Sequence, residues 1–401
     1  MEVTPFLFGA ARALVGIGGL MRRWTTAGLA LALPLALGAA VGATGCAGSS
    51  TSGGAPATAP ASGQPGAPAE SMPTPKPKGA DLTLPGETHL RNVRQVTFGG
   101  QNAEAYWSWD DSALSLQVTP ASGGCDRINV LDLKAGTLTP ITHSGRQTCA
   151  YFLPGDRQIL FASTHELSPD CPPEPDRSHG YTWPLYDYDI YVANRDGSDL
   201  HNITRTPGYD AEATVRSDGR IVFTSTRSGD IELWAMDPDG GNLQQLTHTV
   251  GYDGGAYFSP DGSKLIWRAS RPAPGQEEQD YKDLLAQGLV RPTKMELWTA
   301  NADGSGAYQL TDFGKASFAP YIAPDEKTVV FASNKLDPKG RAFEIWKMNL
   351  DGSGLEQVTH DPSGFNAFPM FSRDGKKLVF SSNRNGSVPH ETNVFVAEWV
   401  P

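Results

Sequence analysis

Short apolar runs alternate with polar turn residues from about residue 90 to the end of the 401-residue chain. The clearest example lies between Gly251 and Arg271, where Ser259-Pro260-Asp261-Gly262 separates two such runs. The first run is Ala256 to Phe258, and the second is Leu265 to Trp267. Proline presets the backbone of a turn and glycine tolerates positive φ, so this stretch predicts an antiparallel β-hairpin.

The hairpin belongs to a longer repeat, in which a hydrophobic residue followed by threonine marks the start of every unit. The marker threonines are Thr97, Thr142, Thr204, Thr247, Thr311 and Thr359. They are 45, 62, 43, 64 and 48 residues apart, which indicates a period near 45 with two insertions. Each unit holds two hairpins, and a period of this length with four strands per unit is typical of a β-propeller blade.

Six units are present, and the sequence also indicates how they close into a ring. The last unit ends shortly after its third strand, whereas residues 90–98 form a strand ahead of the first unit. We expect this first strand to complete the last blade, because a closed ring exposes no sheet edge. The predicted fold class of residues 89–401 is therefore all-β, a six-bladed β-propeller of four-stranded antiparallel blades.

The six hairpins resemble the WD40-like repeats of the TolB-type β-propeller family, and Phe258-Ser259-Pro260-Asp261-Gly262 is nearest to that pattern. The resemblance extends from about residue 90 to residue 400. It implies a binding or scaffold module. TolB-like propellers also occur fused to hydrolase domains and in pectin-fragment lyases, so the resemblance permits an enzyme. The α/β domain that precedes the propeller in TolB is replaced here by a proline-rich stretch.

The N-terminal residues have the pattern of an export signal. Arg22 and Arg23 precede an apolar run at residues 27–41, which is too short to span a bilayer comfortably. Ala43-Thr44-Gly45-Cys46 resembles a bacterial lipobox, which implies a signal peptide over residues 1–45 and lipidation of Cys46. Residues 46–88 are expected to form a disordered tether. We predict a membrane-anchored lipoprotein of the bacterial cell envelope, on the periplasmic side or the cell surface; the alternative is an ordinary cleaved signal peptide.

The charge and the motifs restrict the function. A net charge of -11 argues against electrostatic binding to nucleic acid. The propeller region contains no Gly-x-Ser-x-Gly elbow, no phosphate-binding glycine loop and no metalloprotease helix motif. We therefore expect a monomeric binding protein without a cofactor or a metal, whose partner is an envelope protein, a peptide or a glycan.

The predicted ligand site lies on one face of the ring. Both insertions, residues 166–186 and 272–292, join the second and third strands of a blade and should overhang the same mouth of the channel. Three aligned columns of residues reach this face, and we predict that ten of their polar members bind ligand: Asn102, Gln147, Asp210, Asp253, Asn366, Glu212, His165, Arg227, Arg271 and Arg384. The alternative is that these acids and bases pair between neighbouring blades and hold the ring together.

An enzymatic alternative also stays open. Two carboxylates at the mouth, from Glu104, Asp210, Glu212 or Asp253, could act with His165 in a carbohydrate-active lyase or hydrolase. A zinc or manganese site would need further ligands, and the candidates are His165, Cys171, His179 and Asp187. No established ligand spacing supports that metal site.

Cysteines and one helical stretch complete the predictions for this face. Cys125, Cys149 and Cys171 lie in the propeller region, and an exported chain meets an oxidising compartment. One disulfide is expected. Cys149 with Cys171 is the favoured pair because both belong to the second blade, although the other pairings stay open. In the second insertion, Gln279 to Gly288 predicts a short helix on the rim.

Overall fold

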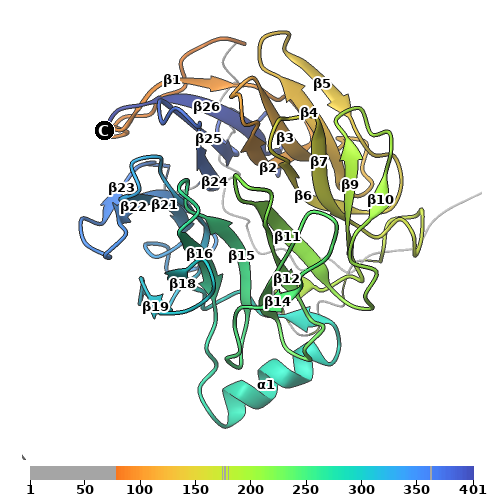
Figure 1. The fold of residues 1–401 in the computed structure, drawn as a ribbon. Helices are drawn as coiled ribbons and strands as arrows, with labels where there is room; N and C mark the ends of the chain where they lie inside the picture. The colour runs from red at the N-terminus through yellow and green to blue at the C-terminus, as the bar shows by residue number, and fades with distance from the viewer. Residues whose placement is uncertain (1–77, 174, 176–177, 179, 362–363) are drawn as a thin grey trace, which may run out of the picture. The chain divides into compact units, whose positions relative to one another are not determined.

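The computed structural model describes residues 78–173, 175, 178, 180–361 and 364–401. These residues form six four-stranded antiparallel sheets arranged as a ring (Figure 1), so the predicted six-bladed propeller is confirmed. The predicted signal peptide, the lipidation site Cys46, most of the tether, and His179 lie outside the described residues.

Each blade runs from an innermost strand, a, through b and c to an outermost strand, d. Blade 1 consists of β2 (Gln101–Trp107), β3 (Ala113–Thr119), β4 (Arg127–Asp132) and β5 (Thr137–Pro140). Blade 2 consists of β6 (Gln147–Phe152), β7 (Gln158–Ser163), β9 (Asp189–Asn194) and β10 (His201–Asn202). Blade 3 consists of β11 (Asp210–Val215), β12 (Ile221–Ser225), β13 (Glu232–Met236) and β14 (Gln244–Gln245).

The second half of the ring repeats this order. Blade 4 consists of β15 (Asp253–Phe258), β16 (Lys264–Ala269), β18 (Glu296–Asn301) and β19 (Tyr308–Gln309). Blade 5 consists of β20 (Ser317–Ile322), β21 (Thr328–Ser333), β22 (Glu344–Asn349) and β23 (Glu356–Gln357). Blade 6 consists of β24 (Asn366–Phe371), β25 (Lys377–Ser382), β26 (Asn393–Trp399) and β1 (Leu90–Gln95).

The ring closes as predicted, because β1 supplies the outermost strand of blade 6. β1 pairs antiparallel with β26, with Leu90 opposite Trp399 and Gln95 opposite Phe395, and the two strands lie side by side in Figure 1. The apolar core fills the spaces between neighbouring sheets, where Phe223 and Phe331 are fully buried. Burial of such faces on both sides of every blade provides the main stabilisation of the ring.

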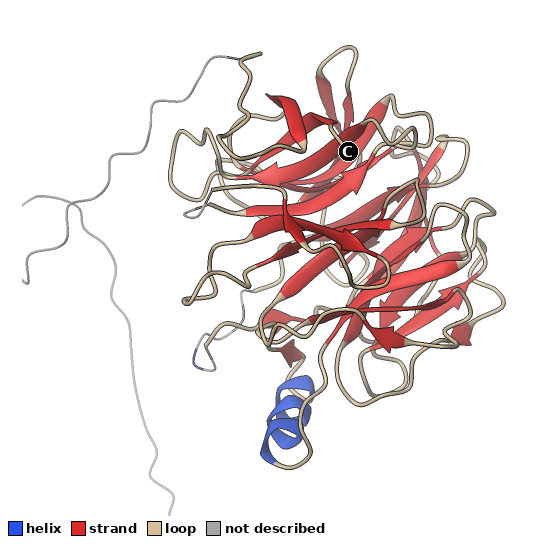
Figure 2. Ribbon diagram, turned by 90° about the vertical axis from the view of Figure 1, so that its left-hand side faces the viewer, coloured by secondary structure: helices blue, strands red, loops and turns tan. Residues whose placement is uncertain are grey.

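The two insertions meet each other above the ring. β8 (Trp183–Pro184) in the first pairs antiparallel with β17 (Leu289–Val290) in the second. The predicted rim helix is present as α1 (Gln276–Leu285), which projects from the stack of sheets in Figure 2. Within the described ranges, no helix is both long enough and apolar enough to cross a membrane.

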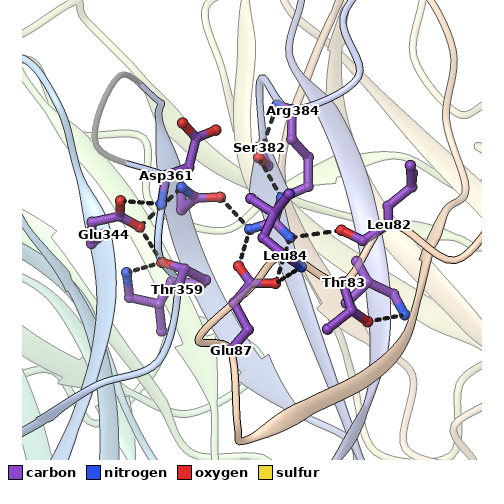
Figure 3. Close-up of polar contacts among 12 residues, drawn as sticks. Leu82, Thr83, Leu84, Glu87, Glu344, Thr359, Asp361, Ser382 and Arg384 are labelled. Atoms are coloured by element: carbon purple, nitrogen blue, oxygen red, sulfur yellow. Dashed lines mark hydrogen bonds and ion pairs between the residues drawn. The ribbon is translucent and has the colours of Figure 1, made fainter. Parts of the chain in front are cut away.

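The repeated threonine has the same structural role in all six blades. Its hydroxyl accepts a hydrogen bond from a backbone N–H at the start of strand c, as in Val394 to Thr97 at 2.8 Å and Ile345 to Thr359 at 2.8 Å. The same bond is made by Thr142, Thr204, Thr247 and Thr311. Thr359 also donates to the Glu344 carboxylate at 2.5 Å (Figure 3). The marker therefore recurs because every blade needs this link between its outer strands.

A second recurring contact joins strand a to strand b. Arg227 binds Asp210 at 2.7 Å in blade 3, and Arg271 binds Asp253 at 2.7 Å in blade 4. Each guanidinium also stacks on a tryptophan of strand c in its own blade. Pairing between neighbouring blades, which the sequence left open, is therefore wrong for these residues. The pairs lie within blades because the end of strand b is opposite the start of strand a.

Blade 6 obtains the acid for this contact from outside the blade. Arg384 donates to Asn366 at 2.9 Å, but its charge is balanced by Glu87, whose carboxylate lies 2.7 Å away (Figure 3). Arg384 also donates to the backbone carbonyl of Leu82 at 3.3 Å. The side chains of Glu87 and Arg384 are 0% and 3% exposed. This buried pair therefore ties the segment before β1 to the blade that β1 completes.

The disulfide joins Cys125 to Cys171, so the predicted pair of Cys149 with Cys171 is wrong. Cys125 lies in the b–c loop of blade 1, and the blade 2 insertion also contacts the connection between the two blades, where Gly145 N–H donates to the Pro169 carbonyl at 2.8 Å. Cys149 keeps a free thiol on the innermost strand of blade 2. The insertion folds outward over its neighbour, so membership of one blade does not bring Cys149 and Cys171 together.

Replacing Cys125 and Cys171 together by serine should lower the free energy of unfolding by about 2–4 kcal/mol, because the unfolded chain regains the entropy of an open loop. Denaturant unfolding measures this difference, and Cys149→Ser is the control that keeps the disulfide. Peptide mapping without reduction should recover a peptide that links Cys125 to Cys171. Recovery of a linked Cys149 peptide would contradict the structure.

Glu87→Gln should lower the free energy of unfolding by about 3 kcal/mol, because Arg384 would keep a buried charge without a counter-ion. The control is Glu278→Gln on α1, whose pair with Lys282 is solvent-exposed and worth about 0.3–0.5 kcal/mol. Urea unfolding midpoints compare the two variants. Equal midpoints would show that the segment before β1 does not hold blade 6.

Candidate functional site

A cavity of about 240 Å³ lies at the mouth of the channel, on the face that carries both insertions. Every innermost strand contributes one residue at the same level of its wall. These six residues are Glu104, Cys149, Glu212, Gly255, Ala319 and Phe368. Each of them lies two residues after the first polar column of its blade, as Glu104 does after Asn102. One residue position, repeated around the ring, therefore contributes to the wall in every blade.

Each of these six residues lies in a β-bulge. In blade 1, strand a advances three residues from Ala103 to Tyr106 while strand b advances two, from Gln117 to Ser115. The same shift occurs in the other five blades. All six residues have φ between 46° and 62°, which costs a residue other than glycine about 1–2 kcal/mol. Backbone strain that is repeated at a cavity marks it as a candidate functional site.

Four tyrosines pack on one another to form the floor beneath the cavity, and two of them, Tyr106 and Tyr257, line it directly. Tyr106, Tyr151, Tyr257 and Tyr321 lie two residues after their bulges and are at most 7% exposed. The rings of Tyr106 and Tyr257, from opposite sides of the ring of blades, are 6.1 Å apart between centroids, so they meet across the channel. The cavity therefore opens toward the insertions and is closed beneath by packed rings.

The first insertion covers part of the cavity. Trp183, which its short pairing with β17 holds in place, lies 5.2 Å from Phe318 and 6.4 Å from Tyr252 between ring centroids. Leu185, Tyr186 and other residues of the same insertion also line the cavity. Both insertions were expected over one mouth of the channel, and the structure places them there.

One side of the cavity contains an ion pair, in which a guanidinium balances the charge of a carboxylate. Arg268 on β16 reaches Glu212 on β11 of the next blade, and Tyr252 and Thr224 donate to the same carboxylate at 2.8 and 2.7 Å. The Arg268 guanidinium stacks on Trp183 at 5.3 Å. Gly255 makes this path possible, because a Cβ there would collide with the guanidinium.

In the described part of the chain, Glu104 has no such cationic partner. Its Oε2 accepts a hydrogen bond from the Cys149 thiol at 3.1 Å and from the Tyr106 hydroxyl at 3.3 Å. Burial raises the pKa of Glu104 and the nearby charge of Glu212 raises it further, whereas the Cys149 bond and the charge of Arg268 oppose the rise. Burial and the same two carboxylates hold the pKa of the Cys149 thiol well above its usual value, so this cysteine is a weak nucleophile.

Of the ten predicted ligand-binding residues, Glu212 lines the cavity, and the other nine are not among its lining residues. Asp210, Asp253 and Asn366 are at most 1% exposed and bind the arginines of their own blades. Asn102 and Gln147 are also buried: Asn102 donates to the Gly99 carbonyl and to Asn393 of blade 6, and Gln147 accepts from Thr142. His165 packs on Tyr191, with ring centroids 4.4 Å apart, and burial lowers its pKa.

Sequence reasoning missed Arg268 and did not place Trp183. Arg268 lies inside strand b, one residue after the buried Trp267, where the sequence pattern predicts an apolar strand. The available signal was Gly255, the one glycine in the bulge column. Among the described residues, no group of three or more His, Cys, Asp or Glu is placed to hold a metal ion, and Cys171 of the metal alternative is disulfide-bonded.

Neither a protein-family model nor a curated protein matches the chain, but solved structures do. A putative TolB from Agrobacterium tumefaciens aligns with a TM-score of 0.50 and 19% identity, over 75% of this chain and 91% of that one. TolB from Acinetobacter baumannii aligns with a TM-score of 0.48 and 15% identity, over 75% of this chain and 64% of that one. An oligogalacturonate lyase in complex with manganese aligns with a TM-score of 0.47 and 14% identity, over 77% of this chain and 80% of that one. Such identities concern the fold alone, and the fold of this chain is a TolB-like β-propeller.

Proposed function

We propose that this protein is a lipid-anchored binding module of the cell envelope, whose propeller captures part of a protein, peptide or glycan in the cavity beneath the insertions. The observation that carries the proposal is the wall of the cavity. Six bulges, five of them at a residue other than glycine, place one residue each around a space that an aromatic cover shields, and among the described residues the Glu104 carboxylate there lacks a cationic partner. Strained backbone conformations cost folding free energy, which favours a role in ligand binding over a role in blade packing alone.

The size of the cavity restricts what enters it. About 240 Å³ corresponds to roughly eight times the volume of a liquid water molecule. Such a space accommodates one side chain or one sugar unit, but not a folded segment. The partner is therefore held mainly on the surrounding surface, with one group inserted as an anchor.

Two observations support an exported location. The N-terminal residues have the pattern of a lipoprotein signal ending at Cys46. The disulfide between Cys125 and Cys171 is typical of proteins that mature in an oxidising compartment.

Cys46→Ser should move the protein from the membrane fraction to the soluble fraction, because the lipid attachment site is lost. The wild-type protein should partition into detergent and carry a mass increase from acylation. Cys149→Ser is the control and should stay membrane-bound. A Cys46→Ser variant that remained with the membrane would contradict the anchor.

Trp183→Ala should weaken capture of the partner about tenfold or more, because the aromatic cover of the cavity is lost. Pull-down from envelope extracts and glycan arrays, both with the Cys46→Ser form, measure the capture. The control is Leu243→Ala, an exposed apolar residue on the c–d turn side of blade 3. Equal capture by both variants would place the binding surface elsewhere.

A carbohydrate-active enzyme is the second candidate, and one observation favours it. Two carboxylates share the cavity in different environments: Glu104 has a raised pKa, whereas Glu212 is paired with Arg268. Glycosidases use such a contrast to separate an acid from a base or nucleophile. An argument against an enzyme is that the Glu212 carboxylate already accepts hydrogen bonds from Thr224 and Tyr252. Turnover of a polysaccharide that both Glu104→Gln and Glu212→Gln abolish would decide for the enzyme.

A further inference from the structure

The charges that line the cavity do not balance. Among the described residues that line the cavity, three carboxylates, of Glu104, Asp126 and Glu212, face two guanidinium groups, of Arg146 and Arg268, and none is a lysine or a histidine. Arg268 pairs with Glu212, and Arg146 lies 3.7 Å from Asp126. Among the described residues, Glu104 is therefore the lining carboxylate without a cationic partner.

The position of Glu104 also leaves one of its oxygens available. Both hydrogen bonds that it accepts, from Cys149 and Tyr106, go to Oε2. No donor within the described part of the chain bonds to Oε1. Glu104 is partly exposed although the tyrosine floor beneath it is buried, so its accessible part faces the cavity.

Aromatic rings make up a large part of the described lining of the cavity into which this carboxylate faces. Nine of the lining residues are aromatic: Tyr106, Trp183, Tyr186, Tyr188, Tyr209, Tyr252, Tyr257, Phe318 and Phe368. The faces of such rings attract cations, and three of them already contact Arg268. An aromatic enclosure with one uncompensated carboxylate is complementary to a positively charged group of the ligand.

We propose that the cavity binds the ammonium group of a lysine side chain from a protein or peptide partner, with Glu104 as its counter-ion. The inference rests on the proposed binding function and specifies the group that anchors the partner. The four methylenes of lysine fit an aromatic-lined space, because an alkyl stem buries apolar surface and needs no hydrogen bonds.

Other cations fit less well. An arginine fork requires both oxygens of a carboxylate, and Oε2 of Glu104 is already engaged. An amino sugar would bring hydroxyl groups that need partners in the cavity. Glu212, Arg268 and Tyr252 are bonded to one another and offer few.

The pH dependence follows from the surroundings of Glu104. The titratable and charged groups around it are Tyr106 on its own strand, Cys149 on β6, Glu212 on β11, Tyr257 on β15, Arg268 on β16 and Asp126. Its pKa is raised in the unliganded protein, and a bound ammonium favours the ionised form. Affinity should therefore rise as the pH increases through this raised pKa, until lysine itself loses its proton near pH 10.

The test uses four small probes and the full-length protein in detergent. The probes are Nα-acetyl-lysine methylamide, its Nε-acetyl derivative, the norleucine analogue and glucosamine. Calorimetric titration should detect saturable binding of the lysine probe below about 10 mM. The Nε-acetyl and norleucine probes should bind about tenfold more weakly, because they lack the charge.

Variants locate the interaction. Glu104→Gln, which preserves the shape of the side chain, should weaken the lysine probe about tenfold, leave the norleucine probe unchanged and remove the pH dependence. Asp239→Asn, an exposed carboxylate in a c–d turn, should change nothing. Thermal unfolding checks that both variants fold; the comparison of charged and neutral probes on the wild-type protein tests the proposal in any case.

Three results would overturn the proposal: equal binding of charged and neutral probes, no binding of the lysine probe at about 10 mM, or tighter binding of glucosamine. If any of these occurred while Trp183→Ala still abolished capture of the partner, the binding function would stand without the ammonium site. If capture were also insensitive to Trp183, both proposals would fail.

Discussion

An extra residue in the innermost strand of every blade is the constraint on which the cavity depends. It places Glu104, Cys149, Glu212 and their three counterparts at one level of the channel. Five of the six are not glycine, so the backbone bears a cost that the surrounding ring must hold. Two residues further on, tyrosines from four blades meet and close the channel below. The bulge thus produces a shallow pocket in place of an open pore.

The cover of this pocket is assembled from segments that lie far apart in the chain. A pairing as short as that of β8 with β17 is marginal by itself. Two further links support it, the disulfide at Cys171 and the stacking of Trp183 on Arg268. Because Arg268 also pairs with Glu212, the cover, blade 3 and blade 4 share one charged contact. The position of the cover is therefore coupled to the electrostatics of the wall.

The buried polar contacts and the cavity wall are separated by two residues along one strand. The first polar column is buried, and its two acids, Asp210 and Asp253, pair within their own blades with Arg227 and Arg271. The bulge column, two residues later, faces the cavity. Buried charges that are paired and stacked support the blade ends, and this leaves the bulge column available for a ligand. Blade 6 differs because Glu87, from outside the blade, supplies the acid.

The sequence by itself determined the blades, their number, the closure by β1 and the helix near residue 280, because turn chemistry, apolar runs and the marker threonine act within a few residues or repeat at a fixed period. Only the tertiary structure decided three things. It decided which cysteines pair, that the Arg227–Asp210 and Arg271–Asp253 ion pairs lie within blades, and that Arg268 enters the cavity. Those outcomes depend on where loops fold over neighbouring blades and on a bulge that redirects side chains. Folding of this kind brings together residues such as Glu87 and Arg384, and no local sequence pattern predicts that they are close in space.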